Sequence, residues 1–205
     1  MTSSGRRHPI VFGAVVASLG VLVQAAGADD HPSVRVRIEN HADLPTGVLA
    51  GAQSDAARIY RAAGIGVVWL NRAEPHGDAG FVRVVIPSLK RADEYLRLEH
   101  VDPHALADAN AATRLVHIFW ERLRTSASQV GRDEAGALGQ VLAHEIGHVL
   151  LPGAGHSATG IMQASIELRI LGALRFTAQE GEQMRDHLCQ APEMAVSGAE
   201  AIRLH

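Results

Sequence analysis

The pattern His144-Glu145-Ile146-Gly147-His148 constrains this chain more than any other feature. In an α-helix, residues four apart lie one turn above each other on the same face, so the imidazoles of His144 and His148 can reach one metal ion. Glu145 lies roughly 100° around the helix axis from His144, beside the metal, where a carboxylate can accept a proton from water. The pattern therefore predicts a helix that carries two zinc ligands and a general base.

A third ligand is expected downstream, because zinc sites that do chemistry usually keep three protein ligands and one open position. Pro152 and the glycines at 153 and 155 favour the end of the helix and a reversal of the chain, which would present His156 to the metal. Glu167, further along the chain, is the alternative, because a carboxylate oxygen can also bind zinc. Of the two, the residues favour His156.

These residues carry a family resemblance. The stretch resembles the metzincin metallopeptidases, whose pattern is HExxHxxGxxH followed by a turn that contains methionine, and is similar in particular to short secreted bacterial matrixin-like proteins. His144, Glu145 and His148 match at their positions, while the resemblance implies His156 as the third ligand and Met162 as the Met-turn residue.

One departure from the family pattern lies between the second and third histidines. His156 follows His148 by eight positions where the family has six, and Leu151 stands where the usual turn glycine would be, with Gly153 two positions later. The chain therefore has a longer loop in front of the third ligand.

The resemblance implies a fold and a function. The fold would be an α/β (α+β) metzincin-like zincin domain, with a mixed twisted sheet, an upper helix, a buried HExxH helix, a Met-turn and a C-terminal helix. The cofactor would be Zn²⁺, and the activity would be endopeptidase cleavage of a protein or peptide substrate with Glu145 as general base. Alternatives are an inactive metzincin-like binding or structural protein, a peptidase that uses Glu167 as third ligand, and a zinc amidase with a non-protein substrate.

The N-terminal 28 residues have the pattern of a signal peptide. Arg6 and Arg7 precede an apolar run over residues 10–26, and Ala26-Gly27-Ala28 is a small-x-small cleavage site. Cleavage after Ala28 would release a secreted or periplasmic domain, residues 29–205, with no membrane contact and with a tail at 191–205 that can fray. A membrane anchor and twin-arginine export are weaker alternatives, because the run is marginal for spanning and the fuller export signature is missing.

Charge and composition narrow the function further. The chain has 19 Lys and Arg against 22 Asp and Glu, and loss of Arg6 and Arg7 with the leader leaves 17 against 22, a formal charge of −5. Nucleic acid is therefore an unfavourable partner. Hydrophobic residues make up 47% of the chain, which argues against disorder. The lone cysteine, Cys189, excludes an internal disulfide and is expected as a small buried side chain on the last helix.

Hydrophobic periodicity predicts most of the remaining elements. Residues 88–113 have no clear pattern; if the metzincin resemblance holds, they should supply the edge of the substrate cleft, where an extended peptide can join the sheet. Asp133 is the expected N-cap of the motif helix, and Thr177 and Glu180 form an expected capping box. Residues 71–80 and 122–132 are polar connecting segments. Strands are predicted at 33–39, 66–70, 81–86 and 115–120, and helices at 45–63, 138–151 and 177–189.

Overall fold

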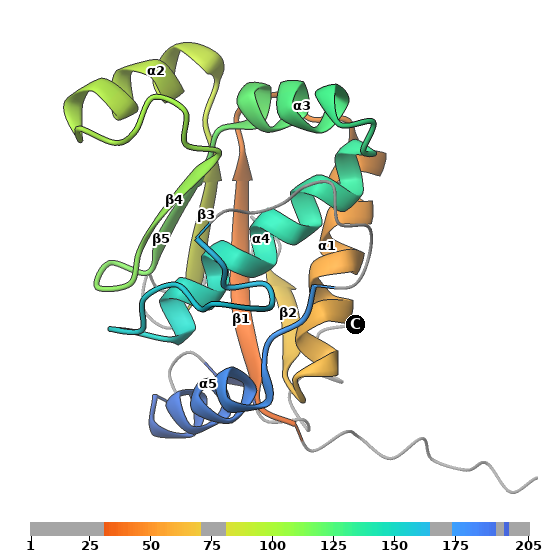
Figure 1. The fold of residues 1–205 in the computed structure, drawn as a ribbon, viewed down its shortest axis with the longest axis vertical. Coiled ribbons are helices and arrows are strands. Elements are labelled where there is room, and N and C mark those ends of the chain that lie inside the picture. The colour runs from red at the N-terminus through yellow and green to blue at the C-terminus, as the bar shows by residue number, and fades with distance from the viewer. Residues whose placement is uncertain (1–30, 71–80, 165–173, 192–194, 197–205) are drawn as a thin grey trace, which may run out of the picture.

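The computed structural model describes residues 31–70, 81–164, 174–191 and 195–196 of the chain. Within them, one mixed sheet is covered by helices (Figure 1). The strands are β1 (Ser33–Asn40), β2 (Gly66–Leu70), β3 (Val82–Ile86), β4 (Ala107–Asn110), β5 (Leu115–Ile118) and β6 (Ala195–Val196), and the helices are α1 (Thr46–Ala62), α2 (Leu89–Leu98), α3 (Trp120–Gln129), α4 (Glu134–Leu150) and α5 (Ala178–Gln190).

The strand order is β2-β1-β3-β5-β4. Strands β2, β1, β3 and β5 run parallel, and β4, at the end of the sheet, runs antiparallel to β5. The two-residue β6 pairs antiparallel with the start of β1. The fold is therefore a mixed α/β arrangement whose β4 edge belongs to the part of the chain that has no clear sequence pattern.

Alternation along the strands decides which face of the sheet is buried. In β1, Val34 and Val36 are fully buried in the main core, and Val36 pairs in register with the equally buried Val82 of β3. Arg35 and Arg37, at the alternate positions, belong to the other face of the sheet, where the guanidinium of Arg37 lies 4.2 Å from the ring centre of Phe81. This period of two is the signal by which the sequence predicts the strand.

Helices α1 and α4 pack closely against each other because small residues line their contact. A Cβ atom on Gly51 would lie 2.9 Å from the Cβ of Ala135, and one on Gly139 would lie 2.9 Å from the backbone oxygen of Ala52. Fourteen residues of α4 are buried, so the motif helix runs through the centre of the fold. The expectation of a buried HExxH helix is confirmed.

Helix termini follow the predicted caps. The side chain of Asp133 accepts a hydrogen bond of 2.6 Å from the backbone N–H of Gly136. Thr177 and Glu180 form the capping box at the start of α5, with the backbone N–H of Glu180 donating to the Thr177 hydroxyl at 3.2 Å and that of Thr177 donating to the Glu180 carboxylate at 2.7 Å. These contacts satisfy N–H groups that have no partner inside the helix.

Three predictions from the sequence need correction. The strand expected at 115–120 ends at Ile118, and α3 (Trp120–Gln129) begins at the last residue of that predicted strand and takes up most of the predicted polar connection at 122–132. Residues 88–113, which have no clear sequence pattern and were expected only to supply an edge of the sheet, form α2 and the edge strand β4. Cys189 is exposed on α5, so the expected burial is wrong, since the helix turns Leu188 and Met184 towards the core instead.

Several expectations concern residues that the structure does not describe. The leader at 1–28, the loop at 71–80, Glu167, and most of the tail at 191–205 lie outside the described residues. Of the helices formed by the described part of the chain, none has the length and apolarity needed to cross a membrane.

The close approach of α1 and α4 gives a test with a matched control. In Gly139→Ala, the new methyl group would lie 2.7 Å from the Cβ of Asp55 and 2.9 Å from a backbone oxygen, so we expect destabilisation by about 1–3 kcal/mol. Gly47 lies exposed near the start of α1 with no atom within 4 Å of its added Cβ, so Gly47→Ala should be neutral or stabilising by up to about 1 kcal/mol. Urea unfolding measures both; equal stability of the two variants would contradict the packing.

Candidate metal centre and cleft

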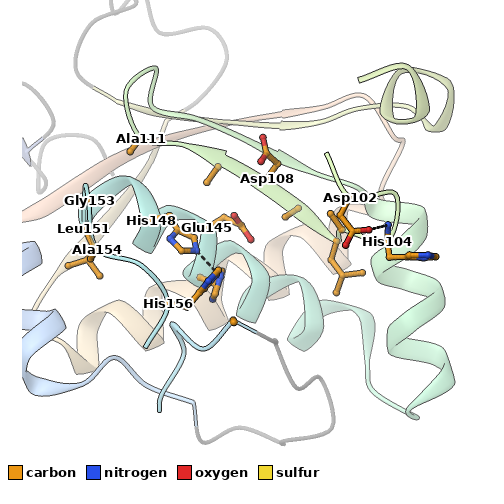
Figure 2. Close-up of a pocket in the computed structure, with 16 residues that line it drawn as sticks. Asp102, His104, Asp108, Ala111, Glu145, His148, Leu151, Gly153, Ala154 and His156 are labelled. Atoms are coloured by element: carbon orange, nitrogen blue, oxygen red, sulfur yellow. Dashed lines mark hydrogen bonds between the residues drawn. The ribbon is translucent and has the colours of Figure 1, made fainter. Parts of the chain in front are cut away.

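Three imidazoles meet at the C-terminal half of α4. His144 and His148 come from successive turns of the helix, and His156 comes from the loop that follows it. One ring nitrogen from each histidine lies within 4.8 Å of the other two, which makes a group able to hold a metal ion. Figure 2 shows His148 and His156 beside Glu145, on the side of α4 that faces β4.

The spacing of the donor atoms suits a zinc ion. The Nε2 atoms of His144 and His148 lie 3.0 Å apart. Two nitrogens that bind one tetrahedral Zn²⁺ at 2.0–2.1 Å are separated by roughly 3.3 Å, so a small adjustment lets both bind. The ring centre of His156 lies 5.5 Å from that of His144 and 4.9 Å from that of His148. Three imidazole nitrogens are a common Zn²⁺ ligand set, and the residues therefore fit this ion.

A backbone hydrogen bond orients the first histidine. Nδ1 of His144 lies 2.7 Å from the carbonyl oxygen of Ile161, and since a carbonyl only accepts, Nδ1 carries the proton and donates it. Nε2 is then left with a lone pair that points towards His148 and His156. Such a bond from the outer ring nitrogen to a carbonyl is a common way to fix a metal-binding histidine.

Burial keeps the two helix histidines neutral. Desolvation lowers the pKa of His144, and desolvation together with the neighbouring imidazoles lowers the pKa of His148 to about 4. A protonated imidazole cannot bind a metal ion, so the lowered pKa values favour the metal-binding form of both residues, and His148 keeps it down to about pH 4.

The loop before His156 leaves the helix at Leu151. The backbone N–H of Ala154 donates to the Leu151 carbonyl at 3.0 Å, and Gly153 adopts a φ of 79°, which favours glycine. This reversal brings His156 back to the two helix histidines although eight positions separate it from His148. The loop residues and His156 itself are exposed.

Met162 lies beneath the metal-binding turn of α4. Its side chain is 1% exposed, and a Cβ atom on Gly147 would lie 2.7 Å from the Met162 sulfur and 3.1 Å from the Phe176 ring. Gly147 is the motif residue directly before His148, so its missing side chain lets the sulfur pack against the helix between the two ligands.

Glu145 is buried beside the three histidines. Only 7% of its surface is exposed. Burial, with a smaller contribution from Asp108, raises the pKa of its carboxyl to about 8. Glu145 lines a cleft of about 750 Å³ that also contains the three histidines, so its carboxylate shares one open space with the metal centre (Figure 2).

Strand β4 forms the opposite wall of this cleft. Ala107 and Ala109 line it and also pack against the main core, on the α4 side of the strand. Asp108, between them, pairs in register with His117 and accepts a hydrogen bond of 2.7 Å from the Tyr95 hydroxyl. The alanine methyl groups of the edge strand therefore face the metal centre. The hydrogen bond from Tyr95 to Asp108 ties the strand to α2.

The cleft continues at both ends of β4. A cavity of about 450 Å³ beside α3 shares His104 and Leu106 with it. At the other end, a cavity of about 270 Å³ shares Ala111 and reaches His187 of α5. These three spaces share lining residues near the two ends of β4, and the metal centre lies in the middle one; together they are called the groove.

Two contacts near the site were not predicted from the sequence. The hydroxyl of Tyr60, a fully buried residue of α1, donates to the carbonyl oxygen of Ala143 at 2.9 Å, directly before His144. On the other side, Glu180 of α5 accepts a hydrogen bond from the Ser157 hydroxyl, directly after His156. No local pattern could reveal the first, which joins residues 83 positions apart.

Neither a protein-family model nor a curated protein matches the chain. Among solved structures, the crystal structure of a zinc-dependent peptidase from Methanocorpusculum labreanum (strain Z) is similar at 16% identity and a TM-score of 0.45, over 73% of this chain and 99% of that chain. The functional conclusion rests on the geometry of the metal centre and its cleft.

The third ligand can be tested by metal analysis of variants. His156 is in the histidine group, so we expect His156→Ala to lower the zinc content of the purified protein well below one ion per chain. Glu167→Ala is the matched control and should keep stoichiometric zinc. Zinc loss in the glutamate variant alone would show that His156 is not the ligand.

The raised pKa of Glu145 predicts a pH dependence of stability. Without metal, the native state holds a proton on Glu145 up to about pH 8, whereas the unfolded chain loses it near 4.5, so this group lowers stability as pH rises between those values. Glutamine does not titrate. The stability of Glu145→Gln relative to wild type should therefore increase from pH 4.5 to 8 and stay constant above, measured by urea unfolding in the presence of a chelator.

Added zinc provides the control for this measurement. A divalent cation near the carboxylate lowers its pKa, so the pH-dependent difference between the two proteins should shrink in the zinc-loaded state. A metal-free difference that does not change with pH would show that the carboxyl is not buried as described.

Proposed function

We propose that this chain is a secreted, zinc-dependent endopeptidase with a metzincin-like catalytic domain. One observation carries the proposal: the nitrogens of His144, His148 and His156 lie within 4.8 Å of one another, next to the buried carboxyl of Glu145, in a groove along the edge strand of the sheet. A metal ligand set, a general base and a place for an extended chain are what peptide hydrolysis requires.

In this proposal the three histidines hold the metal. When bound there, Zn²⁺ would act as a Lewis acid towards the scissile carbonyl and would make a water molecule easier to deprotonate. His144 keeps its Nε2 directed at the centre through its bond to Ile161, and Met162 packs beneath the helix turn between His144 and His148.

Glu145 moves the proton. Its carboxylate accepts a proton from the water whose oxygen attacks the peptide carbon, and the resulting carboxylic acid donates that proton to the departing amine nitrogen as the C–N bond breaks. The products are one new carboxylic acid and one amine, and Glu145 returns to its carboxylate form. Burial raises the pKa of Glu145 in the metal-free centre, and a bound cation would lower it again, so that the carboxylate would be available as the base near neutral pH.

The groove supports internal cleavage of an extended substrate. Strand β4 is the last strand of the sheet on this side, so the backbone of a peptide can pair with it as one further strand. The cavities at both ends leave space for substrate residues on either side of the scissile bond. An exopeptidase would instead be expected to close one end of the groove around a chain terminus.

The proposed location outside the cytoplasm rests on the sequence. Residues 1–28 combine Arg6 and Arg7, an apolar run and a small-x-small site, which is the pattern of a cleaved signal peptide. The metzincin assignment likewise rests on the HExxH motif, His156 and Met162. The mixed sheet with an antiparallel edge strand beside the motif helix is compatible with it.

Cleavage of peptides with blocked ends tests the proposal. The wild-type protein with stoichiometric zinc should cleave N-acetylated, C-amidated peptides of about ten residues at internal bonds, detected by mass spectrometry. Glu145→Gln should lose at least about 100-fold in rate, since general acid–base catalysis contributes about 10²–10⁴-fold, and should still bind zinc. Hydrolysis only of peptides with a free terminus would replace endopeptidase by exopeptidase, and no hydrolysis of any peptide by the zinc-loaded protein would contradict the proposal.

A further inference from the structure

The carboxylate of Glu180 connects α5 to the loop that carries His156. Glu180 is 6% exposed and belongs to the capping box of α5, in which one of its oxygens accepts the backbone N–H of Thr177 at 2.7 Å. Its other oxygen accepts a hydrogen bond from the hydroxyl of Ser157. A capping box needs only the first of these contacts, so the bond to Ser157 is an additional connection between two segments.

Ser157 is held from two sides. Its backbone N–H donates to the carbonyl oxygen of Met162 at 2.7 Å, and its hydroxyl donates to Glu180. The same short loop contains Ile161. Its carbonyl oxygen accepts a hydrogen bond from Nδ1 of His144, and its backbone N–H donates to the carbonyl oxygen of Arg175 at 3.0 Å. The segment 157–162 is therefore fixed to α4 on one side and to the chain that leads into α5 on the other.

The position of His156 depends on the hydrogen bonds of Ser157 more than the positions of His144 and His148 do. His144 and His148 are held by a buried helix, whereas residues 152–156 are all exposed and contain two glycines. Ser157 is the residue next to His156 on its C-terminal side, and it is only partly exposed. An exposed ligand on a long loop must lose conformational freedom when it binds a metal, unless its neighbour already restricts it.

We propose that Ser157 and Glu180 are positioning residues of the metal centre. The Ser157–Glu180 hydrogen bond holds the backbone beside His156 and directs the imidazole towards His144 and His148. Helix α5 thereby takes part in zinc binding, although no residue of α5 belongs to the histidine group. The inference rests on the proposed zinc site and explains how a loop two residues longer than the family pattern can still deliver its ligand.

Zinc affinity separates this role from a purely structural one. Ser157→Ala removes the bond to Glu180 and leaves the capping box intact, so zinc binding should weaken by about 10- to 100-fold while the melting temperature of the metal-free protein stays close to wild type. Thr177→Ala is the matched control. It removes the cap but keeps the bond to Ser157, so it should lower the metal-free melting temperature by about 2–4 °C and leave zinc affinity unchanged.

Two further variants complete the experiment. Ser157→Thr keeps the hydroxyl and should retain zinc affinity within about threefold of wild type, because the bond to Glu180 remains possible. Glu180→Gln keeps the size of the side chain but leaves a single oxygen to accept from both the Thr177 N–H and the Ser157 hydroxyl. It should therefore weaken zinc binding as Ser157→Ala does. Zinc dissociation constants come from competition with a chromophoric chelator, and melting temperatures come from circular dichroism.

The outcomes distinguish failure of the inference from failure of the proposed function. If the wild-type protein binds no zinc, the metal centre itself is wrong. If it binds zinc, and Ser157→Ala and Glu180→Gln bind equally tightly, the positioning role is overturned. It is also overturned if both variants lose stability in the metal-free state and this loss accounts for the whole decrease in zinc affinity.

Discussion

The hydrogen bond from His144 to the carbonyl of Ile161 is the contact on which the rest of the site depends. It crosses from the buried motif helix to the loop containing Met162, so it orients a ligand and fixes that loop at the same time. Met162 can then pack against Gly147, where any side chain would collide with the sulfur. A helix histidine, a loop carbonyl and a packed methionine thus form one unit, and the exposed His156 is attached to it through Ser157.

The elements that were predictable from the sequence are those with a strong local pattern. Strand β1 alternates apolar and charged residues, and α4 and α5 have recognisable caps. Helix α3 was missed because only Trp120, Leu123 and Ala127 face the core, and the polar residues between them dominate its composition. Strand β4 was missed because its inward residues are alanines, whose small methyl groups give little contrast with the polar residues between them.

The grouping of the three histidines was predictable from the sequence, but the contacts that hold them in place were not. A helical repeat places His144 and His148 together by geometry alone, and the glycine-rich reversal indicates His156. Burial of Cys189 was a wrong prediction, because composition and helix position do not define which side of α5 meets the core. The contacts of Tyr60 with Ala143 and of Ser157 with Glu180 join distant segments, and such contacts exist only once the tertiary fold has formed.

The electrostatics of the metal-free centre are unfavourable in a way that a cation would relieve. Burial holds the pKa of Glu145 near 8, and the neighbouring histidines together with burial hold that of His148 near 4, so neither group ionises readily. The Nε2 atoms of His144 and His148 lie 3.0 Å apart, and because Nδ1 of His144 carries its proton, Nε2 of His144 accepts a hydrogen bond from Nε2 of His148. A divalent ion would replace this proton, bind both nitrogens and stabilise the carboxylate, so metal binding and folding stability should be coupled at this site. The histidines and the buried Glu145 are therefore costly to bury without a metal ion, and a bound cation would compensate for that cost.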